Sequence, residues 1–89
     1  MKSAQVTIIN KLGLHARAAA KLVQLSNQFT AAITLEKDGE DADAKNIMDV
    51  LMLAGTKDTV LTVTTDGADE AEALAQVEQL IQERFGEEE

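Results

Sequence analysis

The sequence lacks cysteine altogether and has only two aromatic residues, Phe29 and Phe85. Without cysteine, the chain has no disulfides, no thiol nucleophile and no zinc or iron–sulfur site of the usual cysteine type. No apolar run approaches the roughly 18 residues of a membrane-spanning helix, and the first residues do not resemble a secretory signal. We therefore expect a soluble, cytoplasmic protein that does not insert into a membrane.

Acidic residues are missing from the N-terminal third. Residues 1–35 contain four bases and no acid, whereas residues 36–89 contain all 16 acids and four bases. The overall net charge of −8 argues against a nucleic-acid partner, because phosphates attract a basic face, and two phenylalanines form no stacking platform for single strands. Most of the acids are expected only to keep a small domain soluble. The acid-free third instead predicts an anion site within an acidic molecule.

The length of 89 residues predicts one domain, residues 1–89. Apolar periodicity predicts strands at 5–10, 31–37, 40–44 and 59–65, and helices at 16–25, 47–53 and from Asp69 to Gly86. The chain lacks proline, but glycine marks the major breaks. Asp38-Gly39 predicts a type I′ hairpin and so an antiparallel pair of strands. The expected fold class is α+β, β-α-β-β-α-β-α: a four-stranded antiparallel sheet with three helices on one face.

The two longer helices have apolar stripes that are expected to face the sheet. The stripe of the first helix consists of Ala16, Ala19, Ala20, Leu22 and Val23. The stripe of the last helix consists of Ala71, Leu74, Val77, Ile81 and Phe85. The three glutamates after Gly86 are interpreted as a solvated tail.

His15 is the only histidine, and it directly precedes the alanine-rich helix. A helix start has up to four unpaired N–H groups and about half a positive charge, so it favours an anion. With His15 at the N-cap, its ring lies beside the backbone N–H groups of Ala16 and Arg17, and the Arg17 guanidinium suits phosphate oxygens. Lys11 and Lys21 flank this position at longer range.

His15 can be interpreted as a residue that carries a group covalently or as a surface histidine without function. An imidazole is a nucleophile that can carry a group covalently, which favours a phosphoryl-acceptor site. A surface histidine without function remains the alternative on the residues alone. A metal site is not expected, because one histidine without cysteine does not build a usual zinc ligand set.

Gly13-Leu14-His15-Ala16-Arg17 resembles the active-site signature of HPr, the histidine phosphocarrier family of the bacterial phosphotransferase system. The resemblance extends over nearly the whole chain, including Asn10–Arg17 and the second signature Lys45-Asn46-Ile47-Met48. It implies an HPr-like open-faced β-sandwich, in which Nδ1 of His15 accepts a phosphoryl group from phosphorylated enzyme I. The group then passes to a histidine of an enzyme IIA domain, and Arg17 assists. The resemblance implies a carrier without a cofactor rather than a turnover enzyme.

Three details of the resemblance concern subtype and regulation. The run Asn10–Gly13 together with Met52-Leu53 resembles the nitrogen-related branch, NPr. Ala18 stands where many members have proline, and no loss of function is expected because alanine suits a helix. Asn46 stands where many members have a regulatory serine; asparagine can still cap the helix but cannot be phosphorylated. No regulatory phosphorylation site is therefore expected.

Apolar residues of the short helix predict a docking surface for the partner proteins. Met48 and Leu51 are expected to contact enzyme I and enzyme IIA transiently, with Leu14 and Ala20 at the rim. Core packing is the alternative for this helix. We expect the chain to be a monomer between these encounters.

Two other classes of function are alternatives to a phosphoryl carrier. A regulatory module would bind proteins through the helix around Met48 and need no chemistry at His15. An acyl carrier needs an Asp-Ser-Leu attachment site. Ser26 lies between Leu25 and Asn27, so this class is rejected.

Overall fold

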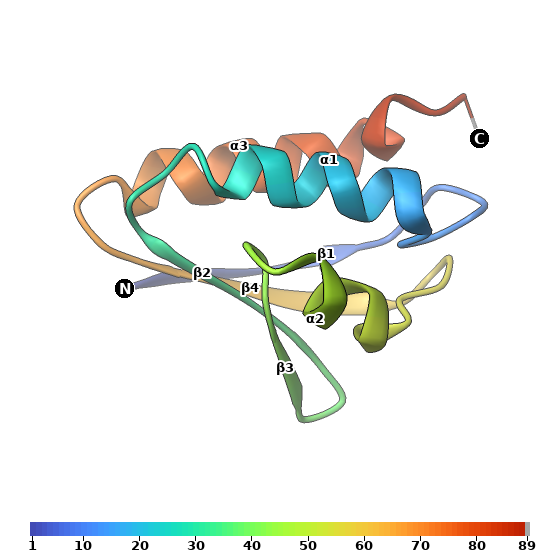
Figure 1. The fold of residues 1–89 in the computed structure, drawn as a ribbon, viewed down its shortest axis with the longest axis horizontal. Helices are drawn as coiled ribbons and strands as arrows, with labels where there is room; N and C mark the ends of the chain where they lie inside the picture. Colours follow the sequence, from blue (N-terminus) through green and yellow to red (C-terminus); the bar gives the residue numbers. More distant parts are fainter. Residues whose placement is uncertain (89) are drawn as a thin grey trace.

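The computed structural model describes residues 1–88. These residues form the strands β1 (Lys2–Thr7), β2 (Ala32–Lys37), β3 (Glu40–Asp43) and β4 (Val60–Asp66). The helices are α1 (Ala16–Ser26), α2 (Ile47–Leu53), α3 (Glu70–Gln82) and a short 3₁₀ turn, η1 (Arg84–Gly86). Helices α1 and α3 pack against each other over one face of the sheet (Figure 1). No helix in this part of the chain is long and apolar enough to cross a membrane.

The four strands form one antiparallel sheet in the order β1-β4-β2-β3. The β2–β3 hairpin turns at Asp38 (φ 51°) and Gly39 (φ 84°). Both residues have the positive φ that a type I′ turn requires, so the hairpin prediction is confirmed. The predicted α+β class and element order are also confirmed.

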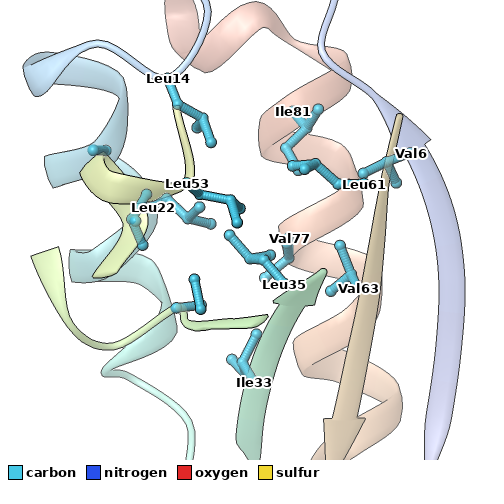
Figure 2. Packing of buried hydrophobic residues seen from close by; sticks show 14 of the residues in the cluster. Val6, Leu14, Leu22, Ile33, Leu35, Leu53, Leu61, Val63, Val77 and Ile81 are labelled. Atoms are coloured by element: carbon cyan, nitrogen blue, oxygen red, sulfur yellow. The ribbon is translucent and has the colours of Figure 1, made fainter. Parts of the chain in front are cut away.

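The core lies between the inner face of the sheet and the helices (Figure 2). Alternate residues of each strand point into it, for example Leu61 and Val63 of β4, which are fully buried. Leu14, which precedes α1, also points into this core and is only 5% exposed. The loop that leads to α1 is therefore anchored to the core.

The buried stripes of α1 and α3 differ from the predicted ones at their first residues. Ala71 is exposed, and Ala73 is buried in its place, because Ala73 lies on the same helical face as Val77 and Ile81 at a spacing of four residues. Ala16 is exposed and Ala18 buried for the same reason, since Ala18 is spaced four residues from Leu22.

The end of the last helix also differs from the prediction. Helix α3 ends at Gln82 rather than at Gly86, and the chain kinks where Arg84 (φ 58°) and Phe85 (φ 55°) enter the left-handed region. Phe85 is buried as predicted, but it reaches the core from η1 rather than from the helix. The residues after the kink lie at the same end of the molecule as the start of α1 (Figure 1).

A close backbone approach fixes the loop before α1. The Leu14 N–H donates to the Gly55 carbonyl at 2.7 Å. Gly13 has φ 65°, and a Cβ atom there would lie 2.4 Å from the Gly55 oxygen. Only glycine fits this position without displacing the backbone beyond α2. The segment after α2 and the loop carrying His15 are thereby held together.

Candidate functional site

His15 lies at the N-cap of α1, where the sequence predicted it. Its backbone is extended (φ −72°, ψ 175°), and its side chain makes no capping hydrogen bond. The Ala19 N–H donates to the His15 carbonyl at 2.8 Å. Ala19 is the first residue of α1 whose N–H finds an acceptor within the helix. The N–H groups before it, those of Ala16, Arg17 and Ala18, have no acceptor there. The helix start therefore keeps donors available for an anion.

The His15 ring contacts a residue from the opposite end of the chain. Nε2 lies within hydrogen-bonding distance of a carboxylate oxygen of Glu87. The other carboxylate oxygen accepts a hydrogen bond from Asn10 Nδ2 at 3.0 Å. Asn10 is fully buried, and the same Nδ2 also donates to the Gly13 carbonyl at 2.8 Å. One buried amide thus links the loop before α1 to the Glu87 carboxylate.

Glu87 corrects the interpretation of the terminal glutamates as a solvated tail. Its side chain is only 15% exposed, against 26% for His15. Burial raises the pKa of the Glu87 carboxyl, but hydrogen bonds from His15 and Asn10 outweigh this effect, and the pKa lies below its usual range. Glu88 is exposed as expected. Glu89 lies outside the described residues.

A cleft of about 430 Å³ opens at this point, lined by Lys11, Leu12, His15, Arg17 and Glu87. Arg17 is exposed and makes no hydrogen bond or ion pair with the rest of residues 1–88, so its guanidinium can turn to a ligand. Lys21 does not line the cleft; its Nζ donates to the Phe85 carbonyl at 2.6 Å. In the described part of the chain, no three potential ligand side chains gather to hold a metal ion.

The residues predicted to dock partners divide into exposed and buried ones. Met48 is 61% exposed on α2, whereas Leu51 is partly buried and packs against the core. Ala20 is partly buried on α1. Leu14 corrects the prediction: its side chain lies in the core, not at the rim of a surface. Further large apolar residues are exposed but were not predicted to dock partners: Met1, Leu12, Ile47, Met52 and Val60.

Asn46 caps α2 as the sequence predicted. Its side-chain oxygen accepts hydrogen bonds from the Met48 N–H at 3.0 Å and the Asp49 N–H at 3.2 Å. Asp49 lies in the first turn and complements the helix dipole.

Two residues of the site, Asn10 and Glu87, were not predicted from the sequence. Asn10 lies in the stretch that carries the resemblance, and an asparagine directly after an apolar run was the available signal. Glu87 had no such signal, because 72 positions separate it from His15. Only the kink after α3 brings it into the cleft.

Comparisons with known proteins agree with this geometry. A family model described as the PTS HPr component phosphorylation site matches residues 2–83. The chain is 49% identical over 87 residues to the phosphocarrier protein HPr of Cupriavidus necator, with 98% of each protein covered.

Solved structures give the same result. A crystal structure of HPr from Thermoanaerobacter tengcongensis has a TM-score of 0.97 at 40% identity, and the match covers 100% of both chains. Bacillus subtilis Crh, described as a dimer with a swapping domain, has a TM-score of 0.76 at 42% identity over 94% of this chain and 97% of that chain.

Proposed function

Because the chain belongs to the HPr family of phosphocarrier proteins, we propose that His15 is its phosphoryl acceptor. His15 receives the group from phosphorylated enzyme I and passes it to a histidine of an enzyme IIA domain. The observation that carries this proposal is the position of the only imidazole at an uncapped helix start, in a cleft shared with Arg17. The protein acts as a covalent carrier in the cytoplasm rather than as a turnover catalyst.

The proposed step occurs at Nδ1. The contact with Glu87 occupies Nε2, whereas Nδ1 makes no hydrogen bond within residues 1–88. The Nδ1 lone pair attacks the phosphorus of the donor's phosphohistidine and forms a new P–N bond. The donor's P–N bond breaks, and its electron pair returns to the donor ring. Transfer to enzyme IIA repeats these events with His15 as the donor.

Three kinds of group stabilise the phosphoryl oxygens in this proposal. The N–H groups of Ala16 and Arg17 supply donors at the positive end of α1. The Arg17 guanidinium adds a charge-assisted contact, and Lys11 contributes a further positive charge at the cleft. These groups are in place before the transfer, which reduces the cost of organising them in the transition state.

In this proposal enzyme I and enzyme IIA dock on α2, and the segment that follows α2 is held to the loop before His15 by the hydrogen bond from Leu14 to Gly55. Met48 is the exposed anchor, and Leu51 and Ala20 support it from partly buried positions. Transfer between two histidines requires close approach, so the partners cover this surface only transiently. We propose that the chain is otherwise a monomer and that Asn46 leaves it without a serine switch. The NPr subtype stays a prediction.

The exposed apolar surface of α2 also favours a second candidate, a regulatory binding module. Such a module would bind its partners equally well with and without the His15 imidazole. It differs from a carrier in needing no covalent step.

Incubation with phosphoenolpyruvate and enzyme I from the same organism tests the proposal. We expect a mass gain of one phosphate that acid removes, and no gain in His15→Ala, which should fold normally because the ring lies outside the core. Gln24→Ala, an exposed change on the same helix, is the control and should accept the group normally. Phosphate on the His15→Ala variant, or none on the wild type, would contradict the proposal. Unchanged partner binding with no phosphate would favour the binding module.

A further inference from the structure

We propose that Glu87 is a positioning residue that fixes the proton of His15 on Nε2 and so keeps Nδ1 available as the nucleophile. This inference rests on the proposed function of His15. It concerns a residue beyond the region that the family model matches, which ends at residue 83.

The proton position follows from the chemistry of the two partners. An ionised carboxylate only accepts hydrogen bonds. The hydrogen bonds that lower the pKa of Glu87 keep its carboxyl ionised at neutral pH. The ring nitrogen that it contacts, Nε2, must therefore carry the hydrogen. In the neutral imidazole the lone pair then lies on Nδ1, because the partner of one ring nitrogen determines the state of the other.

The Glu87 carboxylate is held from both sides, so it is suited to positioning. The buried Asn10 amide donates to one carboxylate oxygen, and His15 contacts the other. The preceding residues are fixed as well: Phe85 is fully buried, and Lys21 donates to its carbonyl at 2.6 Å. Gly86 (φ 81°) makes the turn between these two anchors.

The same contact supports the transfer step. When Nδ1 bonds to phosphorus and the hydrogen stays on Nε2, the ring becomes an imidazolium. The Glu87 carboxylate balances this positive charge, as the carboxylate of a histidine–aspartate pair does in hydrolases. No proton needs to leave the ring during the transfer. Glu87 touches neither the phosphorus nor the donor, so it acts through His15.

Two measurements test the proposal on four proteins: the wild type, Glu87→Ala, Glu87→Gln and the control Glu88→Ala. The first measurement is a long-range ¹H–¹⁵N spectrum of the His15 ring at a pH where the imidazole is neutral. We expect a single Nε2–H tautomer in the wild type and the control, and a mixture of tautomers in Glu87→Ala. Glu87→Gln keeps a side-chain acceptor oxygen and should restore the Nε2–H tautomer at least in part.

The second measurement is the rate of phosphoryl acceptance from enzyme I. Glu87→Ala should slow it about tenfold, the size of one lost charge-assisted hydrogen bond. Glu87→Gln should be slower than the wild type even where its tautomer is restored, since it lacks the balancing charge. Glu88→Ala should match the wild type, because Glu88 is exposed and lies outside the cleft.

The outcomes separate this inference from the proposed function. If the wild type accepts phosphate and Glu87→Ala matches Glu88→Ala in both measurements, the positioning role is wrong and the carrier function stands. If the wild type accepts no phosphate, the carrier function is wrong, and the ring spectrum still decides whether Glu87 sets the tautomer. A circular-dichroism melt identifies any variant that has lost its fold.

Discussion

The starts of α1 and α2 differ in how their first backbone N–H groups, which have no acceptor within the helix, are used. Both helices begin after an extended residue, and both have a polar side chain at the N-cap. Asn46 turns its oxygen onto the N–H groups of Met48 and Asp49, which closes the start of α2. His15 makes no capping bond and turns its ring to Glu87, which leaves the start of α1 open.

The surroundings of the two helix starts reinforce this difference. The first turn of α1 has no acid and contains Arg17, whereas the first turn of α2 contains Asp49. At the start of α1 an anion meets unpaired N–H groups and Arg17, while the Glu87 carboxylate in the same cleft is engaged by His15 and Asn10. At the start of α2 the Met48 and Asp49 N–H groups already donate to Asn46, and Asp49 adds a negative charge. The start of α1 is therefore open to a ligand because His15 contacts Glu87 instead of capping the helix, and α2 is left to present apolar side chains.

The largest effect after loss of His15 itself is expected at Arg17, in the open helix start. Arg17→Ala removes one charge-assisted contact to the phosphoryl group, so transfer should slow about 10- to 100-fold. The fold should be unchanged, because the side chain is exposed. Quench-flow measurement of phosphoryl transfer checks the rate.

Arg84→Ala is the matched control for Arg17, since Arg84 is the only other arginine and is also exposed. Equal slowing in both variants would show that overall charge, not the site, determines the rate. An unchanged rate in Arg17→Ala would remove its role in stabilising the phosphate.

The next effect is expected at Met48, in the closed helix start. Met48→Glu places a charge on the docking surface and should weaken binding to enzyme I about tenfold, as loss of a moderate hot spot does. Thermal unfolding should change little, because the side chain is 61% exposed. Calorimetric titration with enzyme I measures the affinity.

Two further variants sharpen the assignment of the docking surface. Val60→Glu changes another exposed apolar residue, on β4, and should leave the affinity unchanged. Leu51→Glu should instead destabilise the fold by about 1–2 kcal/mol, because Leu51 packs against the core. Equal loss of affinity in Met48→Glu and Val60→Glu would place docking elsewhere.

The smallest effect is expected at the α2 cap. Asn46→Ala leaves two N–H groups without their acceptor and should cost about 1 kcal/mol of unfolding free energy. For a domain of this size, that lowers Tm by about 4–8 °C. Asn46→Ser should lose far less unfolding free energy, because serine also caps a helix. Calorimetry compares the wild type with these two variants. Equal Tm values for the wild type and Asn46→Ala would show that the cap contributes nothing to stability.

Local sequence was sufficient where neighbours in the chain determine the structure. Asp38-Gly39 predicts its turn because only a few residues adopt positive φ readily. Asn46 predicts its cap because the N–H groups that it accepts lie two and three residues away. His15 was expected at a helix start for a similar reason, since the alanine-rich run begins directly after it.

Predictions that depended on which face meets the core were less successful. Leu14 was expected at the rim of the docking surface, but the close contact of Gly13 with Gly55 turns it inward. Ala71, between Glu70 and Glu72, was assigned to the buried stripe, yet the orientation of α3 on the sheet buries Ala73 instead. A change in helix rotation alters such assignments without changing the apolar content of the segment.

The sequence by itself determined the order of the elements, the antiparallel hairpin, the closed start of α2 and the imidazole at the start of α1. Each of these depends on contacts within a few residues, where backbone preferences and side-chain reach are strong enough to decide. Only the tertiary structure decided that Glu87 and buried Asn10 meet at His15. That contact requires the sheet, α3 and the kink at Phe85 to be in place first, because 72 residues of chain separate its two ends.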